Sequence, residues 1–124
     1  MNSPRPSAPE EAFAALLDSW NGGDPAAVRD LVTDDYVGHM LHMVGGERGR
    51  DEYPAWIERW RALNPGAQFA IDQQIESGDW IASRLRAVRE DRGVAQVAFG
   101  MNFSRCNNGG IAEEWAIWSE WRST

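Results

Sequence analysis

The stretch GMNFSRCNNGGIAEEWAIW, residues 100–118, decides the fold class of this chain. It contains two strand-like segments on either side of Asn107-Asn108-Gly109-Gly110. Asparagine and glycine favour tight hairpin turns because they adopt a positive φ at little cost. The stretch therefore predicts a β-hairpin with strands over residues 94–106 and 111–121.

The same pattern continues toward the N-terminus. Residues 69–77 and 80–90 are rich in strand-forming side chains, and short turns with glycine and aspartate separate them from each other and from the hairpin. Consecutive strands joined by such short turns pair antiparallel. The second half of the chain is therefore predicted to form an antiparallel meander.

The first half of the chain has the periodicity of helices instead. Apolar residues recur at helical spacing before Asn21-Gly22-Gly23, after Asp24-Pro25 and again between residues 51 and 63, which predicts three helices. Residues 36–50, between the second and the third helix, are predicted to be a loop. Helices followed by a meander are typical of an α+β fold, with the helices packed on one side of a curved sheet.

Length and composition limit the functions to consider. With 124 residues and a net charge of −7, the chain is expected to form one domain, residues 10–122, behind a flexible tail of residues 1–9. Nucleic-acid binding needs clustered cations, and the sequence has no basic stripe. No apolar run is long enough to span a membrane, and the N-terminus has no apolar signal core. Because Cys106 has no second cysteine to pair with, the cytoplasm is the expected compartment.

The cations also exclude one kind of chemistry. All 12 cationic residues are arginines, so no lysine can form a Schiff base or attach pyridoxal phosphate. We expect no cofactor. The abundance of alanine, glycine and arginine is typical of proteins from GC-rich bacteria.

Two segments carry a resemblance to a known family. SWNGGDPAAVRDLVTDDYVGH, residues 19–39, and the hairpin at residues 100–118 resemble the SnoaL-like polyketide cyclases of the nuclear transport factor 2-like superfamily. The resemblance implies an α+β cone in which three N-terminal helices pack on a curved, mainly antiparallel sheet that encloses a pocket. It also implies a homodimer and a hydrophobic small molecule as the ligand. Ketosteroid isomerase and limonene epoxide hydrolase are relatives with the same fold.

The catalytic residues of these families are mostly absent from this sequence. In SnoaL-like cyclases an aspartate follows the tryptophan of the last strand, and an earlier histidine helps to position the substrate. The matching positions here are Ala116 and Asn102, and neither a methyl group nor an amide can transfer a proton near neutral pH. Limonene epoxide hydrolase uses Arg-x-Asp on the second strand, where this chain has Arg84-Leu85-Arg86.

Two histidines are the predicted replacements. His39 lies where the resemblance to ketosteroid isomerase places the general base, and a histidine titrates in the range where a base is useful. His42 follows, so the pair can act as a base or orient a substrate carbonyl; the alternative is a structural histidine at the pocket rim. A metal bound by both histidines would need a third ligand such as Glu47 or Asp35, and we expect none.

Further residues are predicted to bind the substrate or to stabilise its oxyanion. Asn102, Tyr36 or an arginine is the expected oxyanion donor. The predicted substrate-binding residues are Tyr36, Trp56, Asp72, Arg84, Arg86, Glu114 and Trp118. The family's strand phase turns Arg84 and Arg86 into the pocket, with Asp72 and Glu114 as their partners. The strand's own pattern opposes this, since its more apolar residues, Ile81 and Leu85, then face outward.

The same strand phase separates the tryptophans of AEEWAIWSEW, residues 112–121. Glu114, Ala116 and Trp118 are expected to face the pocket. The opposite, outer face of the sheet is expected to form the homodimer interface, through Trp115, Ile117 and Trp121.

Three functions remain in consideration. The first is a cofactor-independent cyclase or isomerase of a hydrophobic polyketide- or terpenoid-like carbonyl compound, with His39 as acid/base. The second is a non-catalytic protein that binds a hydrophobic or acidic small molecule. The third is an epoxide hydrolase-like enzyme with a non-standard site.

Overall fold

The computed structural model describes residues 8–124. The predicted tail of residues 1–9 therefore lies mostly outside the described residues, and Pro9 already belongs to the first helix. The helical elements are α1 (Pro9–Trp20), the 3-10 helix η1 (Pro25–Asp30) and α2 (Tyr53–Leu63). The strands are β1 (Val32–Met40), β2 (Glu47–Gly49), β3 (Gln68–Ser77), β4 (Trp80–Asp91), β5 (Val94–Asn107), β6 (Gly110–Trp118) and β7 (Arg122–Ser123).

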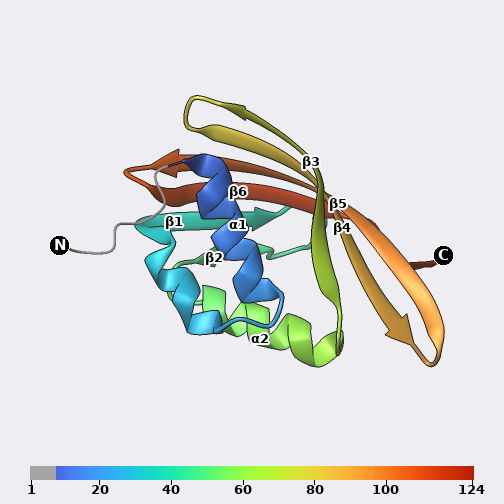
Figure 1. Cartoon of the computed structure of the whole chain (residues 1–124). Coiled ribbons are helices and arrows are strands. Elements are labelled where there is room, and N and C mark those ends of the chain that lie inside the picture. The colour runs from blue at the N-terminus through green and yellow to red at the C-terminus, as the bar shows by residue number, and fades with distance from the viewer. Residues whose placement is uncertain (1–7) are drawn as a thin grey trace.

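The strands form one curved, open sheet, and the helices lie on one side of it (Figure 1). The strand order is β2-β1-β6-β5-β4-β3, and β7 pairs with the end of β5. β1 runs parallel to β6, whereas the other pairings of the described strands are antiparallel. The expected α+β fold with a mainly antiparallel sheet is confirmed, although the sheet is mixed.

The helices do not follow one another as expected. β1 begins at Val32, within the predicted end of the second helix, and together with β2 it occupies part of the segment that was predicted to be a loop, so α2 begins only after two strands. β1 escapes prediction because its polar residues Asp34 and Asp35 are exposed and its register to β6 shifts between Val32 and Val37. Its pairing depends on a partner strand far away in the sequence, which a local pattern does not reveal.

The helix boundaries follow ordinary capping rules. α1 begins with a proline and two glutamates, which suit the positive end of a helix dipole. η1 begins after Asp24, whose carboxylate accepts a hydrogen bond from the backbone N–H of Ala26 at 3.0 Å. α1 packs against the concave face of the sheet, α2 packs mainly on η1 and α1, and the core lies between the helices and the sheet.

The core itself is made of large apolar and aromatic side chains from both layers. Phe13, Leu16 and Ile57 come from the helices, and Ile81 and Ile111 come from the sheet; all five are 3% exposed or less. None of the helices in residues 8–124 combines the length and the apolar character that a membrane crossing requires.

Candidate functional site

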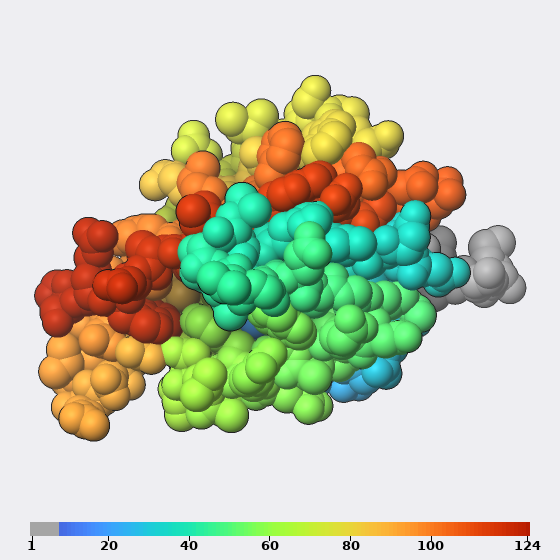
Figure 2. All heavy atoms as spheres, turned by 180° about the vertical axis from the view of Figure 1, so that it is seen from behind, coloured from blue at the N-terminus to red at the C-terminus, as the bar shows by residue number. Residues whose placement is uncertain are grey.

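A pocket with a volume of about 240 Å³ lies between the helices and the concave face of the sheet. Its exposed lining residues, which include Met43, Arg59 and Leu63, mark the mouth, and its buried ones mark the inner end. Figure 2 shows a gap between the turn after β1 and helix α2, with part of α1 visible behind it. The aromatic lining consists of Phe13, Trp20, Tyr53, Trp56, Trp60, Phe69, Trp118 and Trp121.

Glu114 lies at the inner end of the pocket and is only 2% exposed. Its Oε1 accepts hydrogen bonds from the hydroxyl groups of Tyr36 at 2.6 Å and Tyr53 at 3.3 Å. Its Oε2 accepts from the amide of Asn102 at 3.2 Å and lies 3.3 Å from the hydroxyl of Ser104. Because an ionised carboxylate only accepts hydrogen bonds, every one of these partners suits the charged form.

Arg48 supplies the opposite charge. Its side chain comes from the short strand β2, is 4% exposed, and lies with Nη2 3.6 Å from Glu114 Oε1. Its guanidinium also lies over aromatic rings, 4.1 Å from the centroid of Tyr53 and 5.4 Å from that of Trp56. Neither Nε nor Nη1 has a hydrogen-bond partner among the described residues. A buried guanidinium with free N–H groups at a pocket is well suited to bind an oxygen atom of a ligand.

Burial and charge shift the titration of the groups around Glu114. Burial and the negative charge of Glu114 raise the pKa of Tyr53 to about 12, and they raise the pKa of Tyr36 well above its usual range. Burial alone would lower the pKa of Arg48, but its interactions with Tyr53, Tyr36 and Glu114 raise this pKa above its ordinary value. The two tyrosines therefore remain neutral hydrogen-bond donors, and Arg48 remains a cation.

Gly38 in β1 makes room for this arrangement. A Cβ at this position would lie 3.1 Å from Arg48 Cζ and would also collide with the hydroxyl group of Tyr36. Gly38 is paired with Glu114 across β1 and β6. A residue without a side chain therefore stands where Arg48 and Tyr36 must both approach the carboxylate.

The structure brings several of the predicted site residues together. His42, Trp56, Asn102, Glu114 and Trp118 line the pocket. Tyr36 lies behind the lining, where its hydroxyl group donates to Glu114.

The two positions that replace the family's catalytic residues also lie at the pocket. Asn102 and Ala116 both line it and are paired across β5 and β6. The aspartate that the family places at position 116 would therefore have faced the cavity beside Asn102.

His42 lies at the mouth and is exposed. Its Nδ1 accepts a hydrogen bond from the backbone N–H of Trp118 at 3.2 Å. A neutral imidazole that accepts at Nδ1 carries its proton on Nε2, so the second ring nitrogen is a donor.

His39 lies on the other face of the sheet, so its expected place in the pocket is wrong. Side chains alternate between the two faces along β1. Because Tyr36 and Gly38 face the helices, His39 faces the outer side of the sheet. Its ring stacks on Trp115 at 5.4 Å, and its nitrogens lie 2.9 Å from a Glu47 oxygen and 2.8 Å from a Glu113 oxygen. His39 is therefore part of a hydrogen-bonded group on the outer face.

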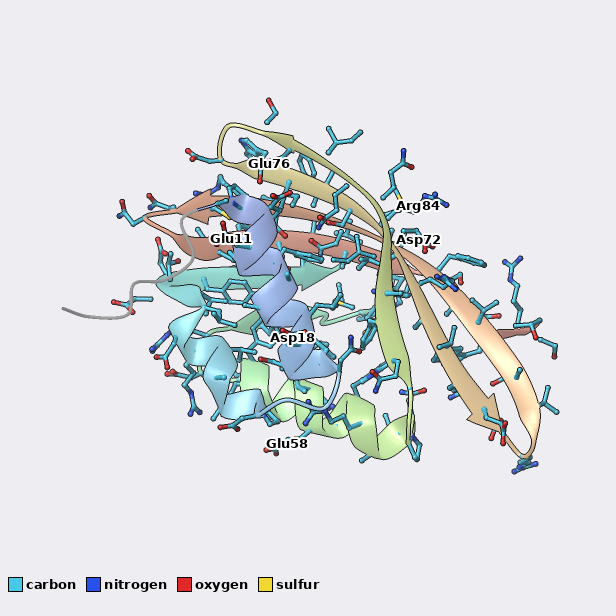
Figure 3. All side chains as sticks on the ribbon, in the orientation of Figure 1. Glu11, Asp18, Glu58, Asp72, Glu76 and Arg84 are labelled. Carbon is cyan, nitrogen blue, oxygen red and sulfur yellow. The ribbon has the colours of Figure 1, made fainter. Side chains whose placement is uncertain are left out.

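Arg84 and Arg86 also lie outside the pocket, contrary to the expected strand phase. In β4 the residues Ile81 and Leu85 are buried, so the alternating arginines are exposed. Figure 3 shows Arg84 and Asp72 on the side of the sheet away from the helices. Arg86 pairs there with Asp72 at 3.1 Å.

The expected partition of the tryptophans is correct for Trp118 and Trp115 and wrong for Trp121. Trp118 lines the pocket, whereas Trp115 lies on the outer face against Trp80 and Phe103. Trp121 also lines the pocket and stacks on Trp60 at 6.0 Å. The alternation does not reach Trp121 because β6 ends at Trp118.

The sequence interpretation missed the charge that faces Glu114. Arg48 lies in a glycine-rich segment that was predicted to be a loop, and nothing in its neighbourhood signals burial. Tyr53 was assigned to a helix, but not to the site. The described residues contain no group of three or more His, Cys, Asp or Glu side chains that could hold a metal ion.

Comparison with solved structures shows proteins of the same fold. The structure is similar to wild-type IdmH, a candidate polyketide cyclase from Streptomyces antibioticus, with 24% identity, a TM-score of 0.78, and coverage of 90% of this chain and 91% of IdmH. A loop-truncation variant of IdmH gives 26% identity, a TM-score of 0.80, and coverage of 90% and 92%. An LEH-like epoxide hydrolase from M. tuberculosis gives 14% identity, a TM-score of 0.73, and coverage of 92% and 86%.

Sequence comparison places the chain in a family. No curated protein matches it. The model of the SnoaL-like domain matches residues 13–114, which is most of the chain. The chain therefore belongs to the SnoaL-like domain family.

Proposed function

We propose that this protein is a cofactor-independent cyclase or isomerase of a hydrophobic, polyketide- or terpenoid-like carbonyl compound. The observation that carries the proposal is the buried pair of Arg48 and Glu114 at the inner end of a largely apolar pocket. Removal of a proton next to a carbonyl needs a base for the proton and a donor that stabilises the negative charge on the carbonyl oxygen. A carboxylate beside a cation with free N–H groups can supply both.

The proposed reaction begins with enolisation. Glu114 takes a proton from the carbon next to the carbonyl, the C–H electron pair forms the enolate, and the negative charge on its oxygen is held by the N–H groups of Arg48. In an isomerisation the enolate takes the proton back from Glu114 at another carbon of the conjugated system. In a cyclisation the enolate carbon attacks a second carbonyl of the same molecule, and the alkoxide formed there takes the proton back from Glu114. Base and oxyanion donor must be neighbours because the reacting carbon is bonded to the carbonyl, and the 3.6 Å between Arg48 and Glu114 supports this.

Glu114 is better placed to act as the base than either histidine. His39 lies on the outer face, and the Nδ1 lone pair of His42 already accepts from Trp118. Oε2 is the oxygen of Glu114 that we assign to proton transfer. Ser104 donates mainly to Asn102 Oδ1 at 2.6 Å, which leaves the 3.2 Å contact from Asn102 as the main hydrogen bond to Oε2.

The test measures proton exchange rather than a particular product. The probe is 2-tetralone, a flat bicyclic ketone, in D₂O, and proton NMR follows the loss of its α-proton signals. We expect saturable acceleration by the wild-type protein and a loss of about a hundredfold or more in Glu114→Gln, since general base catalysis contributes roughly that factor. Glu113→Gln is the matched control on the outer face and should keep the activity. Exchange at the buffer rate with wild-type protein, or full activity in Glu114→Gln, would contradict the proposal.

A non-catalytic binding protein is the second candidate. It is favoured by Ala116, which lines the pocket at the position of the family's acid/base. In that case 2-tetralone would bind without faster exchange. The third alternative, an epoxide hydrolase-like enzyme, would need a non-standard site, because Arg84 of the Arg-x-Asp position is exposed on the outer face.

We also propose that a second copy of this chain covers the outer face of the sheet. That face exposes large apolar side chains from neighbouring strands, with Met101 54% exposed and Phe103 and Ile117 each 47% exposed. Trp115 belongs to the same surface, whereas Trp121 does not. Contiguous apolar surface of this kind is typical of protein interfaces.

Light scattering tests the dimer. The wild-type protein should have about twice the chain mass of 13.9 kDa, and Met101→Glu should shift it toward the monomer by placing a charge in the interface. A wild-type protein that stays monomeric would overturn this proposal.

A further inference from the structure

The charges at the inner end of the pocket are balanced before any ligand arrives. Among the described lining residues that are buried, Arg48 carries the positive charge and Glu114 the negative one. Their polar atoms are 3.6 Å apart, so each already neutralises the other. Arg59 and His42 are exposed at the mouth and do not take part in this balance.

This balance decides which polar group of a ligand can reach Arg48. A carboxylate there would place a second negative charge beside Glu114, and like charges repel strongly where water is excluded. A neutral carbonyl or hydroxyl oxygen can instead accept from Nε or Nη1 of Arg48 without adding charge. The free N–H groups therefore suit a neutral oxygen.

Aromatic rings form much of the rest of the pocket wall. Phe69 lies edge-on against Trp118 with ring centroids 5.3 Å apart, and Trp60 lies 5.2 Å from Phe69. Such aromatic walls offer faces and edges to a planar ligand. Polar groups of the ligand other than the one at Arg48 find few partners along these walls.

We propose that the pocket selects neutral, oxygen-bearing aromatic or polycyclic compounds over carboxylates, and that Glu114 sets this charge selectivity. The inference rests on the proposed function for the place of the ligand's oxygen at Arg48. It does not depend on any proton transfer.

The experiment uses two ligands with the same ring system. The probes are 2-acetylnaphthalene, a neutral ketone, and 2-naphthoate, a carboxylate, and calorimetry or tryptophan fluorescence measures their dissociation constants at neutral pH. The wild-type protein should bind the ketone about tenfold tighter or more, because one like-charge contact in a partly screened site is expected to cause a difference of that order. Glu114→Gln keeps the shape of the side chain and removes its charge. It should tighten 2-naphthoate binding at least about tenfold, since Arg48 then becomes free to pair with an anion.

Glu113→Gln is the matched control. It removes the neighbouring carboxylate on the outer face and should leave the preference for the ketone unchanged. The inference is overturned if the wild-type protein binds 2-naphthoate as tightly as 2-acetylnaphthalene, if it binds neither, or if Glu114→Gln keeps the wild-type preference. The wild-type comparison decides the selectivity by itself if the variant does not fold.

The two proposals fail separately. A preference for the ketone together with no acceleration of 2-tetralone exchange would contradict the enzyme and support the selectivity. Equal binding of both naphthalenes together with accelerated 2-tetralone exchange would support the enzyme and contradict the selectivity.

Discussion

Glu113 and Glu114 are neighbours in β6, yet they belong to two different surfaces. Glu114 faces the helices, is 2% exposed, and is surrounded by donors and by Arg48. Glu113 faces outward, accepts a hydrogen bond from Arg105 at 3.4 Å, and lies 2.8 Å from a ring nitrogen of His39. The same residue type is thus a buried charge on one side of the strand and a member of a surface ion-pair group on the other.

The difference shows how burial changes the role of an identical side chain. Removing one partner of a buried pair leaves the other charge without compensation, whereas exposed pairs are screened by water. The following experiments test this contrast between the two faces.

The largest effect is expected from Glu114→Ala. The substitution leaves Arg48 buried without its counter-charge and should lower the free energy of unfolding by about 3–5 kcal/mol. Urea denaturation measures the change. Glu113→Ala on the outer face should lower the free energy of unfolding much less. Equal effects of the two variants would contradict the claim that burial makes the charge of Glu114 more important for stability.

The tyrosines of the inner face should make the protein sensitive to alkali. Both tyrosines of the chain, Tyr36 and Tyr53, donate to Glu114. The pKa of Tyr53 is raised to about 12, so the folded state holds this proton more tightly than the unfolded state. The contribution of the Tyr53 hydroxyl group to the free energy of unfolding is therefore fully present below about pH 10. It is lost as the pH rises toward 12, by roughly 3 kcal/mol for two pKa units.

Absorbance of tyrosinate measures this directly. The native protein should show almost none at pH 10, and the signal should appear together with unfolding at higher pH. Tyr53→Phe should weaken the loss of stability between pH 10 and 12. A native protein that ionises one tyrosine at its ordinary pKa near 10 would contradict the burial of the network.

A smaller effect is expected where the pocket wall meets the sheet. A Cβ at Gly100 would lie 2.5 Å from Cδ2 and Cε2 of the Trp118 ring, so Gly100→Ala must displace that ring. The substitution should lower the free energy of unfolding by about 1–3 kcal/mol, as in other overpacked interiors, and it should weaken the binding of 2-acetylnaphthalene. Gly100→Ala combined with Trp118→Phe should recover part of the stability, and strict additivity of the two changes would argue against the contact.

The smallest effect belongs to the outer face and has the opposite dependence on pH. The hydrogen bond to His39, with help from Arg105, lowers the pKa of Glu113. A lowered carboxyl pKa contributes stability that is present above the ordinary value and is lost as the pH falls through the folded-state value. Urea midpoints between pH 6 and 3 should therefore fall slightly more in wild-type protein than in His39→Gln. Identical curves would show that the pair contributes nothing.

The sequence was sufficient for the parts of the fold that depend on local chemistry. The ends of β3, β4 and β5 were predicted to within one residue, because glycine, asparagine and aspartate mark the turns between them. The residues' own pattern in β4 was also right, since Ile81 and Leu85 do face the core. The resemblance to relatives gave the wrong phase for Arg84 and Arg86.

The site was predictable only in part. Asn102, Glu114 and Trp118 follow from the alternation of β5 and β6 together with the phase that the family resemblance supplies. Arg48 does not, because its burial depends on a carboxylate and on aromatic rings that come from distant segments. The same is true of the outward turn of His39, which is set by the pairing of β1 with β6.

The rings around Arg48 have a consequence for the kinds of compound that can bind in this pocket. Tyr53, Trp56 and Trp20 surround the guanidinium with centroid distances of 4.1, 5.4 and 5.9 Å. Aromatic boxes of this kind elsewhere capture quaternary ammonium groups and methylated lysines. Here the chain fills the box with its own side chain, so compound collections dominated by basic amines are a poor source of ligands for this pocket.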